Sequence, residues 1–318
     1  MKTITTDQRE LIDALLAEED VGGISAAILE KDIHVTDALR ALSAIAHEHV
    51  KLVFCGGTSL SKAHSIIERM SEDVDLKVVL APAHGLSDNA LKKHLSSLKG
   101  RVAATLMELD FQEIPEEARA RNANRYFASS WMYSSVYGPH QSLRTHLSVE
   151  FTVRAPAFET SEHQLGYLID RLADQAGEPF AMQCVSVEET LAEKVLSFLR
   201  RFAEHRAKVR EDWDKALVRH IYDTWRIVAV DPGAADRAVA HFKDLVDFDR
   251  IEFPKHKAFV DDPATCMKTA LGEIESDAQT IAEFADKLIP LIYGQHKPPF
   301  NEAFGVFKDV ANKLLGTL

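Results

Sequence analysis

The sequence has few cysteines and no long apolar run, and both absences exclude classes of protein. Its three cysteines, Cys55, Cys184 and Cys266, match no disulfide framework and no zinc-binding spacing. A reducing cytosol is therefore the simplest location. No stretch of eighteen apolar residues predicts a transmembrane helix, and the N-terminus lacks the apolar core of a signal peptide. We expect a cytoplasmic protein with no membrane contact.

The chain also lacks the net positive charge and the glycine motifs of many nucleotide- and nucleic-acid-binding proteins. Its net charge is −12, which argues against broad, non-specific nucleic-acid binding. A P-loop and a Rossmann site are excluded, because neither Gly-Lys-Ser/Thr nor G-x-G-x-x-G is present. Residues 190–226 are locally basic, with nine Lys or Arg against six Asp or Glu. This stretch is either a guide for a triphosphate or an RNA end, or a solvated helix face.

The composition is otherwise that of an ordinary folded protein, with 46% apolar and 27% charged residues in 318. Hydrophobic periodicity predicts early helices over 7–19, 24–47, 58–65 and 89–109, the last broken near Gly100. Strands are predicted over 51–55, 73–80, 125–136, 145–154 and 180–185, with the third and fourth forming a hairpin. Later helices are predicted over 186–207, 211–230, 234–248, 264–288 and 304–315. We expect an α/β domain at 1–185 and a helical domain at 186–318.

The most informative motif joins a glycine turn to a pair of acids. Gly56, Gly57, Thr58 and Ser59 follow an apolar strand, and Asp73-Val74-Asp75 follows a short helix later. Alternate strand residues point to one face, so the two aspartates present their carboxylates side by side. Hard oxygen ligands of this kind suit Mg²⁺. The glycines allow backbone N–H groups to approach an anion closely. The motif predicts a site for a nucleoside triphosphate and a metal ion.

Three further residues of this motif have open roles. Thr58 is placed to cap the following helix, which is compatible with a phosphate contact. Lys62 lies one helical turn further on, and either reaches a phosphate or stays a surface lysine. Arg69 either contacts the substrate or pairs with Asp73 or Glu72.

A longer string around this motif resembles the AbiEii/AbiGii toxin family of the nucleotidyltransferase superfamily. It comprises Glu30-Lys31-Asp32, Val35-Thr36, Leu52-Val53-Phe54 with the glycine turn, and Ile67-Glu68-Arg69 before Ser-Glu-Asp-Val-Asp-Leu. The match covers roughly residues 30–80. It is weaker through Leu191-Ala192-Glu193-Lys194 and Arg219-His220-Ile221-Tyr222-Asp223. His220 departs from the family pattern, where an acid is expected.

The resemblance implies a fold, an activity and partners. The fold is a minimal nucleotidyltransferase-type mixed sheet followed by a helical domain. The activity is metal-dependent transfer of NMP from an NTP to an acceptor, with Mg²⁺ or Mn²⁺ as the metal. The acceptor implied is RNA, such as the tRNA 3′ end, and the protein would be the toxin of a toxin–antitoxin or abortive-infection pair with a cognate antitoxin. A protein or small-molecule acceptor, and a catalytically silent nucleotide-binding module, remain as alternatives.

The resemblance also implies roles for residues outside the first motif. Glu150 alternates with Val149 and Phe151 and is the best match for a third metal carboxylate beside Asp73 and Asp75. Lys194 would contact a phosphate, and Asp223 would orient Lys194 or the nucleophile. Asp212 and Asp214 are rival acids. Glu150 could instead be an ordinary solvent-facing strand residue, and Asp223 could cap a helix or pair with Arg219 or Arg226.

Overall fold

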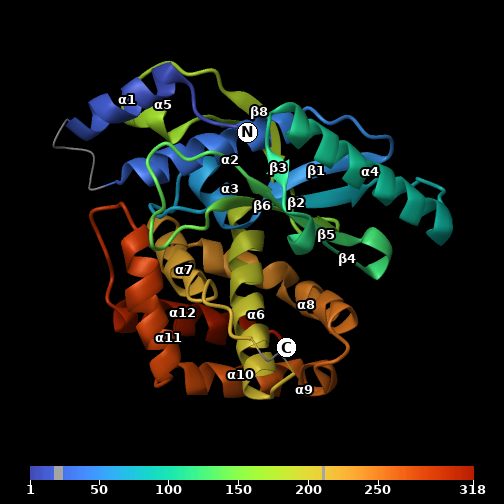
Figure 1. Cartoon of the computed structure of the whole chain (residues 1–318). Coiled ribbons are helices and arrows are strands. Elements are labelled where there is room, and N and C mark those ends of the chain that lie inside the picture. Colours follow the sequence, from blue (N-terminus) through green and yellow to red (C-terminus); the bar gives the residue numbers. More distant parts are fainter. Residues whose placement is uncertain (18–23, 210–211) are drawn as a thin grey trace. The chain divides into compact units, whose positions relative to one another are not determined.

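The computed structural model describes residues 1–17, 24–209 and 212–318, which form two compact units. The first unit comprises residues 1–65, 70–156 and 160–185, and the second comprises residues 66–69, 157–159 and 186–318. Each is described by itself below (Figure 1).

A mixed sheet organises the first unit. Its described strands are β1 (Val50–Cys55), β2 (Asp73–Leu80), β3 (Gln112–Glu113), β4 (Arg119–Arg121), β5 (Tyr126–Met132), β6 (His146–Val153), β7 (Ser161–Leu165) and β8 (Phe180–Cys184). The strand order is β3-β5-β6-β2-β1-β8-β7, and β4 pairs with β5. The β2–β6 and β1–β8 pairs are parallel, and the other pairs are antiparallel. The expected α/β fold with a mixed sheet is confirmed.

Strict alternation of side chains explains the central strands. In β2, Val74, Leu76 and Val78 are almost completely buried, whereas the intervening aspartates are half-buried. In β6, Val149 and Phe151 are fully buried in the same way. Because alternate residues of a strand point to opposite faces, both strands have one apolar and one polar face.

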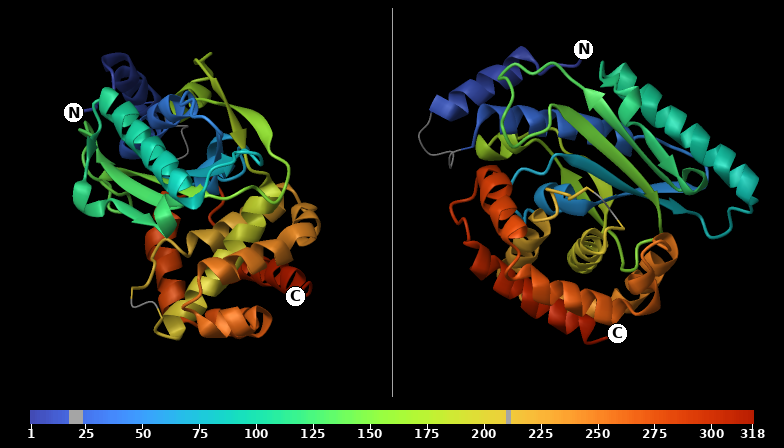
Figure 2. Two further views of the ribbon diagram at one scale, coloured as in Figure 1. Left: turned by 90° about the vertical axis from the view of Figure 1, so that its right-hand side faces the viewer. Right: turned by 60° about the horizontal axis from the view of Figure 1, so that its bottom comes forward.

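Helices surround this sheet. They are α1 (Thr6–Ala17), α2 (Ala26–Ser43), α3 (Gly56–Lys62), α4 (Asp88–Glu108) and α5 (Leu168–Leu172), with short 3₁₀ turns at Pro115–Glu117 and Asn122–Asn124. The long helices α2 and α4 pack together and lie along the same face of the sheet (Figure 2). The expected end of the first helix, residues 18 and 19, lies outside the described residues.

The expected break of α4 at Gly100 is wrong. The helix continues through this exposed glycine, because Leu95, Leu98, Val102 and Leu106 keep an unbroken buried stripe on both sides of it. Burial of that stripe outweighs the intrinsic cost of a helical glycine, which is about 1 kcal/mol.

The second unit is helical. Its main helices are α6 (Val187–Arg206), α7 (Arg219–Val230), α8 (Ala234–Glu252), α9 (Lys257–Asp261), α10 (Pro263–Ile274), α11 (Ala278–Glu283) and α12 (Phe300–Leu315), with short irregular helical turns at Phe284–Leu288 and Ile289–Leu291. No helix in the described ranges is long and apolar enough to cross a membrane.

Two expected helices of this unit differ from the structure. The helix expected over 211–230 begins only at Arg219: residues 212–214 are not helical, residues 215–218 form a turn, and residue 211 lies outside the described residues. The helix expected over 264–288 is interrupted after Ile274, and Asp277 caps a new helix by accepting a hydrogen bond from the Thr280 amide at 2.8 Å. A strong N-cap inside a periodic stretch therefore starts a second helix.

Candidate active site

A tight glycine turn connects β1 directly to α3. Gly56 has a φ of +78°, and a Cβ added there would lie 2.3 Å from an Asp75 carboxylate oxygen. Only glycine tolerates both the left-handed backbone and this close approach. The turn and the second aspartate are therefore in contact.

Hydroxyl groups fix the turn against β2. Thr58 is buried, and its hydroxyl lies 2.5 Å from the Asp73 carbonyl oxygen, to which it donates, and 2.9 Å from the Ser71 hydroxyl. Ser59 is fully buried. Both side chains are placed inside the unit in this arrangement, and a phosphate contact through either hydroxyl stays a prediction.

Three acidic residues share one face of two adjacent strands. Asp73 and Asp75 are the half-buried alternate residues of β2, and Asp75 lies opposite Glu150 in the parallel β6. Side chains of directly paired residues point to the same face. The structure therefore brings Asp73, Asp75 and Glu150 together on this face, and we call them the acidic row.

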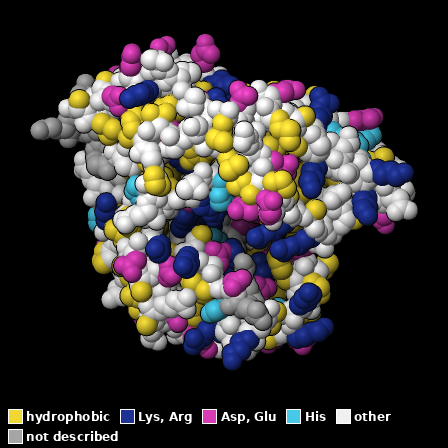
Figure 3. Space-filling model, in the orientation of Figure 1, with side chains coloured by type: hydrophobic (Ala, Val, Ile, Leu, Met, Phe, Trp, Pro, Cys, Tyr) yellow, Lys and Arg dark blue, Asp and Glu magenta, His cyan; other side chains and the backbone are white. Residues whose placement is uncertain are grey.

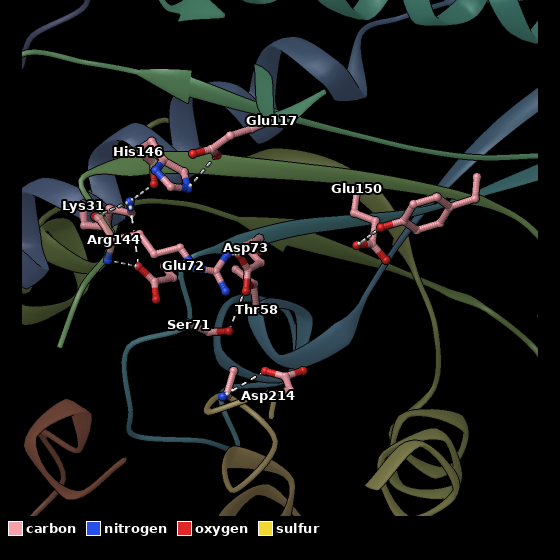
Figure 4. Close-up of polar contacts among 12 residues, drawn as sticks. Lys31, Thr58, Ser71, Glu72, Asp73, Glu117, Arg144, His146, Glu150 and Asp214 are labelled. Atoms are coloured by element: carbon pink, nitrogen blue, oxygen red, sulfur yellow. Dashed lines mark hydrogen bonds and ion pairs between the residues drawn. The ribbon is translucent and has the colours of Figure 1, made fainter. Parts of the chain in front are cut away.

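Two of these carboxylates have a strong partner from a neighbouring segment (Figure 4). The Arg144 guanidinium lies 2.5 Å from Asp73 Oδ1, and the Tyr126 hydroxyl donates to Glu150 Oε2 at 2.8 Å. Burial opposes the charge on Arg144, but Asp73 and Glu72 outweigh burial and raise the pKa of Arg144. Burial, followed by the charge of Glu150, raises the pKa of Tyr126 well above its ordinary value.

The acidic row has the donor chemistry for a divalent cation, because carboxylate oxygens are the ligands that Mg²⁺ prefers. As the side chains stand, the described residues contain no group of three His, Cys, Asp or Glu side chains placed to hold a metal ion. Asp73 faces Arg144 instead, and Glu150 faces Tyr126. A metal ion at this row would share the Asp73 carboxylate with Arg144, which contacts Oδ1, or would displace it.

A buried lysine supports the start of β6 beside these acids. Lys31 of α2 is fully buried, and its ammonium donates to the Arg144 carbonyl at 3.0 Å and to the His146 carbonyl. Glu72 accepts a hydrogen bond from the Arg144 amide at 2.8 Å and lies 3.9 Å from the Lys31 ammonium. These contacts position Arg144 next to Asp73. Arg144 was missed by the sequence analysis, because nothing local marks it.

Lys62 is engaged away from the acidic row. Its ammonium lies 2.7 Å from Asp32 Oδ1, 2.6 Å from the Thr36 hydroxyl and 3.3 Å from the Gly166 carbonyl oxygen. These three acceptors use all three of its donors. Contact with a phosphate would require this network to open.

The other predicted residues meet in the second unit. Asp223 of α7 is completely buried, and its carboxylate accepts from Arg69 Nε at 2.7 Å and Arg69 Nη2 at 2.6 Å. The Lys194 ammonium lies 2.5 Å from Asp223 Oδ2. Burial alone would raise the pKa of Asp223, but Arg69 and Lys194 hold it far below its ordinary value. Arg69 thus pairs with Asp223, a partner that the sequence analysis did not name for it.

The neighbouring groups complete this arrangement. His220 Nδ1 lies 2.9 Å from the Lys194 carbonyl oxygen, and burial, reinforced by the Lys194 charge, lowers the pKa of His220 well below its usual range. His220 is therefore neutral near pH 7. The rival acid Asp214 pairs with Arg201, and Asp212 is exposed. The described geometry joins Asp223, not these two, to Lys194.

Comparison with known proteins places the chain in a family. Residues 37–306 match the family model described as nucleotidyl transferase AbiEii toxin, Type IV TA system. The chain is also similar to MenT4, a nucleotidyltransferase toxin from Mycobacterium tuberculosis H37Rv, with 22% identity over 71% of this chain and 72% of that one and a TM-score of 0.36. No curated protein matches. Because the family model spans most of the sequence, the chain belongs to the AbiEii family of nucleotidyltransferase toxins of toxin–antitoxin systems.

Proposed function

We propose that this nucleotidyltransferase transfers a nucleotide from an NTP to RNA, with the tRNA 3′ end as the acceptor and growth arrest as the result. The observation that carries the proposal is the acidic row beside the glycine turn: Asp73, Asp75 and Glu150 on one face of adjacent strands, with Asp75 against Gly56. In the transfer, an acceptor hydroxyl oxygen forms a bond to the α-phosphorus of the NTP. The bond between that phosphorus and the leaving pyrophosphate breaks. The residues contribute mainly positioning and charge neutralisation.

The three carboxylates of the acidic row share one task in this proposal, which is to hold the metal ion. Asp73, Asp75 and Glu150 would hold Mg²⁺ or Mn²⁺, which supplies positive charge to the attacking and leaving oxygens. Tyr126 keeps the Glu150 carboxylate oriented through its hydroxyl. Arg144, already held beside Asp73, offers a cation for a phosphate once Asp73 releases it.

Lys194 is the proposed phosphate contact of the second unit. It is held by Asp223, which is in turn fixed by Arg69. The buried carboxylate stays ionised and so fixes the direction of the Lys194 side chain. Asp223 would therefore act through Lys194 and not touch the substrate.

A labelling experiment tests this function and its alternatives. The protein is incubated with each α-labelled triphosphate, Mg²⁺ or Mn²⁺, and either total RNA or cell lysate, with Asp73→Asn as control. Label in RNA that is absent with Asp73→Asn supports the proposal. Label in protein or in a small molecule favours the other acceptors, and no label in any fraction favours a silent module.

A growth experiment tests the toxin role. Expression without the cognate antitoxin should arrest a bacterial host, and Asp73→Asn should relieve the arrest at equal soluble expression. Unimpaired growth at high soluble expression in several hosts would contradict growth arrest by this chain.

A further inference from the structure

A short hairpin of the first unit, formed by β4 and the start of β5, carries arginines and no acidic residue. Between Arg119 and Tyr126 the sequence has three arginines, Arg119, Arg121 and Arg125, and no acid. All three are exposed. Among the described residues, the guanidinium groups of Arg119 and Arg121 have neither an ion pair nor a hydrogen bond. The chain has a net charge of −12, and acidic and basic side chains are interspersed over the face drawn in Figure 3. A segment with three arginines and no acid is therefore unusual in this protein.

The strand register connects this hairpin to the acidic row. Arg119 of β4 lies opposite Ala128 of β5, Ala128 lies opposite Glu150 of β6, and Glu150 lies opposite Asp75 of β2. Directly paired residues point to the same face at every step. Arg119 is therefore on the same face as the acidic row, two strands from Glu150 and three from Asp75, which is roughly 10 and 14 Å at about 4.8 Å per strand.

Side-chain contacts also connect the hairpin to the acidic row. The Arg121 guanidinium lies over the Tyr126 ring, 5.4 Å from its centroid, and the Tyr126 hydroxyl binds Glu150. Arg121 and Arg119 both oppose the rise in the pKa of Tyr126 that burial and Glu150 cause. Both arginines therefore act electrostatically on the residue that touches the acidic row.

The turn of the hairpin is strained. Asn122, Ala123 and Asn124 have φ values of 49°, 54° and 68° in succession. Alanine rarely adopts this left-handed conformation, which costs conformational energy. The Asn124 side chain donates to the Lys92 carbonyl of α4 at 3.4 Å, which ties the turn to the unit. Strain of this kind is commonly retained where a backbone is shaped for binding.

We propose that the β4–β5 hairpin binds the phosphate backbone of the RNA acceptor, through Arg119 and Arg121, a few nucleotides before the hydroxyl that reacts. This inference rests on the proposed function. An RNA strand approaching three carboxylates is repelled unless cations accompany it to the site. Arginine binds phosphate in a bidentate manner, and these two arginines are exposed, lack an acidic partner among the described residues, and share the face of the acidic row.

The test measures RNA binding separately from catalysis. Asp73→Asn protein, which cannot turn over, is titrated with labelled tRNA at several salt concentrations, with and without Arg119→Ala/Arg121→Ala. The double substitution should weaken RNA binding about tenfold and reduce the slope of log affinity against log salt by about 1.4, since each contact with single-stranded phosphate contributes about 0.7. In the active protein, KM for RNA should rise while NTP affinity stays unchanged.

The control removes the same charge elsewhere in the unit. Arg9→Ala/Arg101→Ala alters two other exposed arginines, on α1 and α4, and should leave the affinity and the salt slope near those of the parent protein. Arg119→Lys/Arg121→Lys keeps both charges, so the salt slope should be retained while affinity falls between the parent and the alanine variant. If the alanine pair melts early, the lysine pair carries the test.

The outcomes separate this inference from the proposed function. If the parent enzyme labels RNA but the hairpin and control variants bind RNA with the same affinity, the assignment of RNA binding to Arg119 and Arg121 (the hairpin assignment) is overturned and the proposed function stands. No labelling of any RNA overturns the proposed function. RNA labelling by the parent enzyme, together with RNA binding that is weakened only in the hairpin variants, supports the hairpin assignment.

Discussion

The buried triad of Asp223, Lys194 and Arg69 gives the strongest prediction on stability. Asp223→Asn keeps the shape of the side chain but removes the negative charge that contacts two buried cations, Arg69 and Lys194. Arg69 is 2% exposed and Lys194 7% exposed. Loss of one partner from a buried ion pair costs about 3–5 kcal/mol, because the remaining charge stays desolvated. The free energy of unfolding of a typical protein is roughly 5–15 kcal/mol, so this loss would be a large fraction of it.

Lys194→Met provides the matched comparison. Asp223 then keeps both hydrogen bonds to Arg69, at 2.7 and 2.6 Å, so the anion remains paired. The cost should be about 1.5–3 kcal/mol, the value of one charge-assisted hydrogen bond. Combining Lys194→Met with Asp223→Asn should cost less than the sum of the two, because one of the stranded cations is gone.

Urea unfolding followed by tryptophan fluorescence measures these differences, because Trp213 and Trp225 both belong to the second unit. Asp223→Asn should lower the melting temperature by on the order of 10–20 °C. An Asp223→Asn protein within about 1 kcal/mol of wild type at pH 7 would show that the triad contributes little to stability.

The same triad predicts a pH dependence with a definite sign. Although burial opposes the charge, Arg69 and Lys194 hold the pKa of Asp223 far below its ordinary value. A carboxylate with a depressed pKa stabilises the fold above its unfolded pKa of about 3.9 and loses that contribution as the pH falls towards its folded pKa. The stability difference between wild type and Asp223→Asn should therefore be constant from pH 7 to about pH 5 and shrink below about pH 4. A difference that grew on acidification would contradict this assignment.

Three further substitutions test the site. Asp73→Asn should abolish nucleotide transfer without lowering the melting temperature, because it removes a carboxylate from an acidic row whose members repel one another; activity and thermal melting of the same preparation check this. Gly56→Ala should lower stability by about 1–3 kcal/mol and lower activity as well, since the new Cβ meets Asp75 at 2.3 Å on a backbone with a φ of +78°; urea unfolding and labelling measure the two effects. Lys194→Met should weaken NTP binding by roughly 1.5–3 kcal/mol while the stabilisation by Mg²⁺ alone is unchanged, which calorimetric titration and melting separate.

The centre of the first unit was predictable because its signals are local. The glycine pair, the short helix and Asp-x-Asp lie within about twenty residues of each other, and β2 spans Asp73–Leu80 as the alternation indicated. The side of β6 to which Glu150 points also follows from alternation. That β6 lies beside β2 does not follow from any local pattern, because the two strands are separated by a helix and three other strands.

The weakly patterned elements were not predictable. Strand β4 is Arg-Ala-Arg, with every residue exposed, so it has no apolar alternation. Strand β7, Ser161–Leu165, has one buried residue. Such strands form because a neighbouring strand with a clear apolar pattern offers unpaired backbone groups. The sequence signal for β4 and β7 therefore lies in their partners, β5 and β8, rather than in the strands themselves.

Ion-pair partners were the largest gap, for a related reason. Arg69 and its carboxylate partner Asp223 are 154 positions apart, and the Lys31 ammonium and the Arg144 backbone carbonyl to which it donates are 113 apart. Composition and spacing show that a charge is present, but the partner depends on the folded arrangement. The sequence left Arg69 open between Asp73, Glu72 and substrate, whereas in the folded protein it donates two hydrogen bonds to Asp223.

The apolar alternation of two strands is what holds the acidic row together. Shifting β2 or β6 by one residue would turn its acids into the core, so the register that buries the apolar residues also fixes the carboxylates on one face. Burial of Val74, Leu76, Val149 and Phe151 contributes on the order of 6–12 kcal/mol. Repulsion between two carboxylates near a protein surface, at about 4 Å, is at most about 4 kcal/mol, and Arg144 offsets part of it at Asp73. Core burial therefore outweighs the repulsion, and the sheet can maintain a cluster of like charges that no local interaction would favour.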